Sequence, residues 1–317
     1  MATALSISQD VTQNRHIYLG GSDISVVMGL NRYKTPLQLW LEKTQRVQPK
    51  DLSNVESVYF GNKLEQFVAS EFSTRTGKDV RRAPKFYQHP KYPYMVAHID
   101  RLITGEDALL ECKTTSVFNK SEWETEEIPQ EYILQVMWYL GITGRKVGWI
   151  AVLIGGQSFK YKRIDFDAEL FDKMVEKAKD FWKHVTDDTP VDIVANDDET
   201  LKELYSKDNG VMINLFPMDS TSQQACNTFE ETVALYQENK MHISNIEKEN
   251  KILKAKIEDL IKDNLGIQTP KYIVTWNTIT KTSLDTARLK EERPETVENY
   301  KMTSQYRMLK IKKNKEA

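Results

Sequence analysis

The residues of this sequence with the clearest chemical potential are two carboxylates, Asp100 and Glu111, and the amine of Lys113. They lie in two apolar runs on either side of Gly105-Glu106, and a glycine as the first of two central residues suits a type II′ loop between antiparallel strands. Counting outward from this loop places Asp100 directly opposite Glu111. Lys113 follows two residues after Glu111 and shares its face, because strand side chains alternate. The pattern predicts a β-hairpin on which two carboxylates and an ammonium converge.

Like charges that face each other destabilise a sheet, and burial adds a desolvation cost. A cation is therefore expected between Asp100 and Glu111. One interpretation is a structural ion pair with Lys113. The other is a bound divalent metal, because clusters of oxygen ligands select Mg²⁺ or Mn²⁺ over zinc. The spacing alone leaves both interpretations open.

Three further motifs accompany this hairpin. They are Gly20-Gly21-Ser22-Asp23 with the following Asn31-Arg32-Tyr33-Lys34-Thr35-Pro36, the segment Gly61-Asn62-Lys63-Leu64-Glu65, and Gln135 with Tyr139 four residues later. With these motifs in this order, residues 15 to 185 resemble the PD-(D/E)xK nuclease superfamily and, within it, the YqaJ-type viral recombinases of the lambda exonuclease family. One departure from the family pattern is Ile99, which stands before Asp100 where a proline is common.

The resemblance implies a role for each matching residue. The catalytic residues would be Glu65, Asp100, Glu111, Lys113 and Gln135. The metal, two Mg²⁺ ions per site with Mn²⁺ as an alternative, would be held by Glu65, Asp100, Glu111 and the backbone carbonyl of Cys112. Contacts with DNA or its 5′-phosphate would come from Arg15, Ser22, Arg32, Lys34 and Tyr139. Lys113 would position the attacking water and stabilise negative charge, and Gln135 would orient Lys113.

Local pattern alone favours plainer roles for several of these residues. Helix periodicity makes Glu65 a solvated acid beside core positions. Ser22 is a good helix N-cap, and Arg32 and Lys34 are equally well explained as an exposed basic loop. The assignment of these residues to a site therefore depends on the resemblance.

The function that the resemblance implies is a metal-dependent DNA exonuclease. It would degrade linear double-stranded DNA from the 5′ end and leave 3′ overhangs for phage-type recombination by single-strand annealing. A ring-shaped homotrimer and a single-strand annealing protein of the RecT-like class as partner are implied as well. Two alternatives are an endonuclease or junction resolvase with the same metal site, and a non-catalytic DNA-binding or assembly module with a structural ion cluster.

The elements that must position these residues indicate an α/β fold. Apolar residues recur at intervals of three and four from Val55 to Thr76 and again from Pro129 to Gly141, which predicts two helices. Strands are expected at 147–154 and 159–166, with a closing helix at 168–185. This order predicts an α/β domain with a central mixed β-sheet flanked by helices, and the resemblance implies that this domain is a PD-(D/E)xK nuclease core.

Composition shifts divide the chain into four parts. Residues 1–14 are expected to be a mobile leader, 15–186 the nuclease-like domain, 187–222 an acidic connector, and 223–317 a C-terminal α+β appendage with a long, coiled-coil-like helix. In that helix the a positions of a heptad frame are Phe229, Tyr236, Ile243, Asn250 and Ile257, and the d positions are Thr232, Asn239, Ile246, Leu253 and Leu260. A dimer and an antiparallel partner within the chain both satisfy this frame.

Composition also limits the setting of the protein. The formal net charge of −2 excludes a uniformly basic DNA coat but allows basic residues to be concentrated in one channel. Two cysteines, far apart in sequence, argue for a reducing compartment. No apolar stretch reaches about 18 residues, so no membrane span is expected. With the resemblance, this predicts a cytoplasmic protein of a bacterium or of a phage-infected bacterial host.

Overall fold

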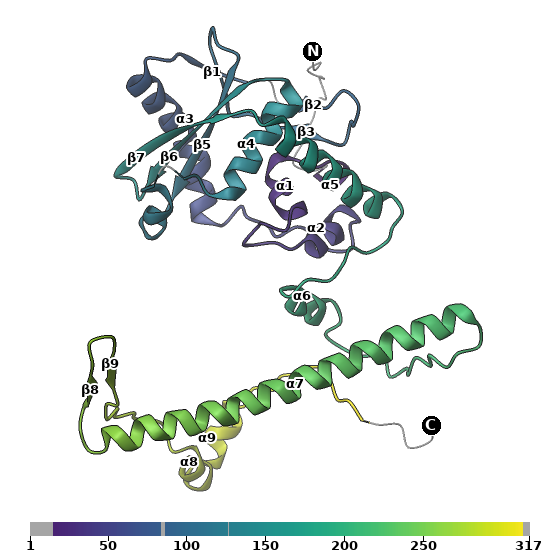
Figure 1. Cartoon of the computed structure of the whole chain (residues 1–317), viewed down its shortest axis with the longest axis vertical. Coiled ribbons are helices and arrows are strands. Elements are labelled where there is room, and N and C mark those ends of the chain that lie inside the picture. The colour runs from purple at the N-terminus through teal and green to yellow at the C-terminus, as the bar shows by residue number, and fades with distance from the viewer. Residues whose placement is uncertain (1–14, 84–85, 126, 313–317) are drawn as a thin grey trace. The chain divides into compact units, whose positions relative to one another are not determined.

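The computed structural model describes residues 15–83, 86–125 and 127–312 (Figure 1). The predicted leader, residues 1–14, lies outside them. The chain divides into two compact units, residues 1–203 and 204–317. No helix in the described ranges is long and apolar enough to cross a membrane.

The first unit is built on a five-stranded mixed sheet, which confirms the predicted α/β fold class (Figure 1). Its strand order is β1 (Val80–Arg82), β4 (Arg101–Ile103), β5 (Ala108–Thr115), β6 (Val147–Ile154) and β7 (Ser158–Asp165). Strands β5 and β6 are parallel and the other neighbours are antiparallel. Two short strands, β2 (Tyr87–Gln88) and β3 (Val96–Ala97), pair with each other beside this sheet.

Helix α3 (Glu56–Thr76) covers one face of the sheet. Its buried Val68 and Phe72 pack in one cluster with Leu110 of β5 and Leu153 of β6. Gly77 ends the helix with a φ of +70°, a left-handed conformation that glycine adopts without strain. The predicted helix over residues 55–76 is confirmed.

Helix α4 (Gln130–Thr143) covers the opposite face and provides the crossover that parallel strands require. It ends at Gly144 and continues past Gly141, so the predicted end at Gly141 was wrong. A Cβ at Gly141 would lie 2.1 Å from Cε2 of Phe171 in α5 (Ala168–Thr186). The glycine is required there because α5 packs closely, and it does not interrupt the helix.

The N-terminal elements are the 3₁₀ turn η1 (Arg15–Ile17), α1 (Gly21–Val27) and α2 (Pro36–Lys43). The buried Lys43 ammonium ties them together, since it donates to the carbonyls of Arg15 and Tyr18 and to Asp23 Oδ2 at 2.6–2.8 Å. A buried charge with this full set of partners is satisfied and fixes the start of α1.

Part of the stretch expected as a connector belongs to the first unit. The side chain of Asp197, at the start of α6 (Asp197–Leu204), is fully buried and accepts a hydrogen bond from the Thr35 hydroxyl. Gln38 Nε2 donates to Thr200 Oγ1 at 2.6 Å. These contacts anchor α6 on the beginning of α2.

The second unit begins with the long predicted helix, α7 (Ser220–Ile261), which has 42 residues. A short hairpin follows, formed by β8 (Gly266–Gln268) and β9 (Ile273–Thr275), and then two short helices, α8 (Thr286–Glu292) and α9 (Pro294–Asn299).

Candidate active site

The hairpin has the register that the sequence predicts. Arg101 lies opposite Leu110 and Leu102 opposite Leu109, and continuing this register by one residue beyond β4 sets Asp100 opposite Glu111. Gly105 has a φ of +77°, as the first central residue of a type II′ loop requires. The backbone N–H of Cys112 donates to Asp100 Oδ2 at 2.8 Å, which fixes this carboxylate across the strand pair.

Gln135 of α4 joins the other polar groups on this face of the sheet. Its Nε2 donates to Glu111 Oε1 and to the Tyr139 hydroxyl, both at 2.7 Å, and its Oε1 accepts from Lys113 Nζ at 3.0 Å. Lys113 Nζ also lies 2.7 Å from Glu111 Oε1. The amide therefore bridges Glu111 and Lys113 and holds the ammonium in one place.

The cluster contains two acidic side chains and one ammonium group. Burial and the nearby charge of Glu111 raise the pKa of Asp100 well above its usual range, although the Cys112 N–H opposes them. Burial acts to lower the pKa of Lys113, but the Glu111 carboxylate outweighs it and the pKa is raised. Two acids with one ammonium favour the arrival of a further cation.

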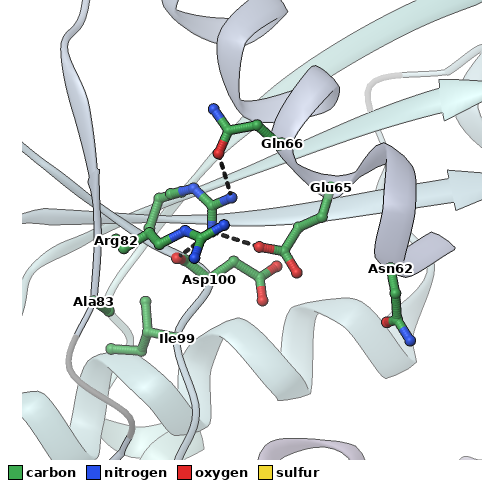
Figure 2. A pocket seen from close by; sticks show the side chains of 8 residues that line it. Asn62, Glu65, Gln66, Arg82, Ala83, Ile99 and Asp100 are labelled. Atoms are coloured by element: carbon green, nitrogen blue, oxygen red, sulfur yellow. Dashed lines mark hydrogen bonds and ion pairs between the residues drawn. The ribbon is translucent and has the colours of Figure 1, made fainter.

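Glu65, on α3, faces a different cation. Its carboxylate is paired with the guanidinium of Arg101, which also donates to Gln66 Oε1 at 3.1 Å. Glu65 and Asp100 both line a polar cavity of about 340 Å³ between α3 and the hairpin, and Figure 2 shows their carboxylates on the same side of it. Glu65 is near enough to contribute to the raised pKa of Asp100.

The donors present fit a divalent cation such as Mg²⁺. Glu111 Oε2 is buried and has no hydrogen-bond partner among the described residues, so this oxygen is available as a metal ligand. Within the same ranges, no three or more His, Cys, Asp or Glu side chains are gathered closely enough to hold a metal, and Glu65 is engaged by Arg101. Mg²⁺ is commonly held by one or two carboxylates together with water and substrate phosphate, which Asp100 and Glu111 can supply.

The predicted phosphate-binding pair is brought together. Arg15 Nη2 donates to Ser22 Oγ at 3.1 Å and lies 3.7 Å from Asp23 Oδ1. Asp23 itself receives the Gly20 N–H at 3.0 Å, which caps α1. Arg15 remains half exposed, so a guanidinium and a hydroxyl are presented at the beginning of this short helix.

The other predicted DNA contacts are engaged within the protein. Arg32 pairs with Glu122 and Glu131 at 2.8 and 3.0 Å, and Lys34 pairs with Glu42 at 2.6 Å. These ion pairs fix the loop before α2 to neighbouring elements, and a role for Arg32 and Lys34 in DNA binding stays a prediction.

Tyr139 lies inside the protein, with 4% of its surface exposed. A Cβ at Gly21 would be 2.4 Å from its ring atom Cε1, so α1 and α4 are in direct contact at this point. The observed role of its hydroxyl is to receive the Gln135 amide, and a direct contact with DNA does not agree with this burial.

Sequence reasoning missed two residues of the site. Arg101 was passed over although it is a charged residue within an apolar strand, a pattern that signals a buried partner. No local sequence pattern indicates Tyr132 as part of the site. Its ring lies 5.2 Å from Lys113 Nζ, but it belongs to the first turn of α4, which is a separate element. Both shape the surroundings of the predicted cluster.

Two solved structures are among the known proteins to which the chain is similar. The crystal structure of the alkaline exonuclease LHK-Exo from Laribacter hongkongensis is 17% identical and covers 55% of this chain and 90% of its own, with a TM-score of 0.46. The structure of LHK-Exo in complex with dAMP is 18% identical and covers 61% and 95%, with a TM-score of 0.45.

Sequence similarity is stronger. The model of the YqaJ-like viral recombinase domain matches residues 11–146. The uncharacterized protein YqaJ of Bacillus subtilis (strain 168) is 39% identical over 300 residues, which are 93% of this chain and 91% of that protein. This similarity along nearly the whole chain shows that the protein belongs to the YqaJ family.

Proposed function

We propose that the protein is a metal-dependent exonuclease that degrades linear double-stranded DNA from the 5′ end. The observation that carries the proposal is the buried cluster in which Gln135 bridges Glu111 and Lys113 opposite Asp100. An acid pair in which Glu111 Oε2 is buried without a hydrogen-bond partner in the described part of the chain is costly for the fold. The same pair of acids suits a site that binds a divalent cation beside a phosphodiester.

We assign a separate role to each residue of the cluster. Asp100, Glu111 and the carbonyl of Cys112 would hold Mg²⁺ or Mn²⁺, and Glu65 would be a further ligand for a pair of ions. A metal at this place would supply activation of water and neutralisation of the charge of the phosphate. Lys113 donates a hydrogen bond to the phosphate oxygen on which negative charge develops, and Gln135 keeps its amine in place.

The direction of degradation is proposed from the N-terminal anion site. Arg15 and Ser22 lie within 3.1 Å of each other, and a guanidinium beside a hydroxyl suits a terminal 5′-phosphate. Removal of nucleotides from that end leaves 3′ single-stranded overhangs. We include in the proposal a single-strand annealing partner, a ring-shaped assembly through which duplex DNA passes, and action in the cytoplasm.

The test compares two DNA substrates and two lysine variants. Linear 5′-phosphorylated duplex and closed circular duplex are incubated with Mg²⁺ and with wild type, Lys113→Ala or Lys173→Ala. Lys173 is a matched control because it is exposed on α5 and pairs with Glu169 of the same helix. We expect the wild type to degrade the linear DNA and to leave the closed circle intact. Lys113→Ala should degrade the linear DNA at least about 100-fold more slowly, and Lys173→Ala should degrade it at the wild-type rate.

Other outcomes would replace the proposal. Nicking of the circle would indicate an endonuclease with the same site. Binding of DNA without Mg²⁺- or Mn²⁺-dependent cleavage of either substrate would indicate a non-catalytic module, in which Lys113→Ala lowers only the melting temperature.

A further inference from the structure

Helix α7 of the second unit carries an apolar stripe that the structure leaves open. We define the α7 stripe as Ile243, Ile246, Leu253, Ile257 and Leu260. Each of these residues is 46–69% exposed with all described residues in place. Large apolar side chains in a continuous row mark an interaction surface, since single exposed ones are common and rows are not.

The stripe follows the heptad spacing of a coiled coil. Ile243 and Ile257 stand at a positions and Ile246, Leu253 and Leu260 at d positions, with Asn250 at the a position between Ile243 and Ile257. β-Branched residues at a with leucine at d favour two parallel strands, and a polar a residue fixes their register. We propose that the occupant of the α7 stripe is α7 of a second copy of this chain, packed parallel and in register.

Asn250 distinguishes parallel from antiparallel pairing. In a parallel, in-register pair each a side chain faces its own counterpart, so the two Asn250 amides can hydrogen-bond to each other. In an antiparallel pair a positions face d positions, and every offset that sets Asn250 against Ile246, Leu253 or Leu260 buries its amide against an apolar side chain. An unpartnered buried amide costs roughly 1–3 kcal/mol, so Asn250 favours the parallel arrangement over these offsets, and an offset that sets Asn250 against Asn239 or Thr232 is left to the cross-linking test.

Charges beside the stripe agree with this arrangement. In a parallel pair, a g residue faces the e residue five positions later on the partner helix. Glu249 stands at g and Lys254 at e, so each Glu249 would face the partner's Lys254 on both sides of the pair. The charges are opposite and the two contacts repeat by symmetry.

A partner helix from the same chain is a weaker explanation. The other described helices of the second unit, α8 and α9, have seven and six residues. The stripe runs over 18 residues of sequence from Ile243 to Leu260, about 27 Å of helix. A six- or seven-residue helix spans less than half of this length, whereas a second α7 spans all of it.

The pairing is tested by disulfide cross-linking in the full chain. Cys226 also lies on α7, so it is first replaced by Cys226→Ser, and Asn250→Cys is compared with Lys248→Cys. Lys248 is exposed at an f position on the opposite side of the helix, and it is the matched control. Diamide is the oxidant, and the products are separated by non-reducing electrophoresis.

We expect Asn250→Cys to form a covalent dimer at least tenfold faster than Lys248→Cys. A parallel, in-register pair brings two a residues at the same position together, whereas an antiparallel pair sets a positions against d positions. Equal rates for the two variants, or no dimer from Asn250→Cys, would overturn the proposal, and an antiparallel pair or a stripe covered by the first unit would give that result.

A charge exchange provides a second measurement that needs no change in the apolar residues. In the Asn250→Cys background, Glu249→Lys or Lys254→Glu alone should slow cross-linking by roughly threefold, because two like-charge contacts replace two attractive ones. The two changes together restore opposite charges and should restore the rate. A double variant as slow as the single ones would contradict the predicted contact. Neither measurement depends on nuclease activity.

Discussion

The guanidinium of Arg101 is paired with the carboxylate of Glu65, although Arg101 directly follows Asp100 in the chain. Asp100 and Arg101 both line the cavity beside α3, but the Asp100 carboxylate is held by the backbone N–H of Cys112 on β5, whereas the guanidinium of Arg101 reaches Glu65 on α3. The carboxylate expected as a third metal ligand is therefore held by a cation of the protein. Metal binding at Glu65 has to compete with this ion pair.

Removal of the competing cation should strengthen metal binding. In Arg101→Gln, Glu65 loses its partner and the site gains one net negative charge. We expect the affinity for Mn²⁺, measured by electron paramagnetic resonance, to rise about five- to tenfold, which corresponds to roughly 1 kcal/mol or slightly more. Arg81→Gln, an exposed residue of β1, makes the same change of charge and should alter affinity little. Weaker binding by folded Arg101→Gln would show that Arg101 positions Glu65 for the metal.

The raised pKa of Asp100 predicts how stability depends on pH and metal. A carboxyl whose pKa is higher in the folded protein than its unfolded value of about 3.9 lowers the free energy of unfolding above that value. This loss is recovered as pH falls through the raised pKa. At pH 7 without metal, Asp100→Asn should therefore raise the melting temperature, by about 2–4 °C for a cost near 1 kcal/mol.

Added Mg²⁺ should stabilise the wild type and have much less effect on Asp100→Asn, because the asparagine removes a ligand charge. Differential scanning fluorimetry with EDTA or Mg²⁺ measures both effects. Asp107→Asn, in the exposed hairpin loop, is the control and should change neither. A lower melting temperature for Asp100→Asn in EDTA would contradict the assignment of a destabilising acid pair.

Gln135 should act by positioning Lys113. Gln135→Leu keeps the approximate size but removes the donor to the Tyr139 hydroxyl and leaves Glu111 Oε1 with Lys113 alone, which costs roughly 1–3 kcal/mol of stability. We expect kcat to fall about 10- to 100-fold with KM little changed. Gln130→Leu, at the exposed first turn of α4, should affect neither parameter. An effect on KM alone would instead place Gln135 in substrate binding.

The contact between α1 and α4 should be intolerant of a methyl group. In Gly21→Ala the new Cβ would lie 2.4 Å from the Tyr139 ring, and such overpacking costs roughly 1–3 kcal/mol. Gly61→Ala is a control of opposite sign. Its Cβ would have Thr114 Oγ1 at 3.4 Å, and alanine stabilises a helix interior by about 0.5–1 kcal/mol over glycine. Urea denaturation of both variants gives the comparison, and equal stabilities would show that α1 can shift.

Arg15 should distinguish 5′-phosphorylated ends. Arg15→Gln removes the charge beside Ser22, and we expect degradation of a 5′-phosphorylated duplex to slow about tenfold, to near the rate for a 5′-hydroxyl end. Arg32→Gln is the matched control, because the Arg32 guanidinium already pairs with two carboxylates. Loss of the preference in Arg32→Gln alone would move the phosphate site to the loop before α2.

The sequence by itself determined the parts of the protein that are encoded locally. Gly105 fixed the loop, and the loop fixed the register that places Asp100 opposite Glu111. Apolar spacing predicted α3 and the long α7, because helix periodicity is a property of neighbouring residues. Similarity of motifs identified the family, which identity along nearly the whole chain then showed.

Tertiary structure alone decided which groups the local elements bring together. Glu65 pairs with Arg101 from 36 residues away, and Gln135 reaches Glu111 from 24. Tyr139, predicted to contact DNA, is buried because α1 packs against it at Gly21. Such contacts depend on how helices pack across the two faces of a sheet, and their energies come from burial and charge between distant segments. No local sequence pattern predicts these contacts, so only the folded structure shows them.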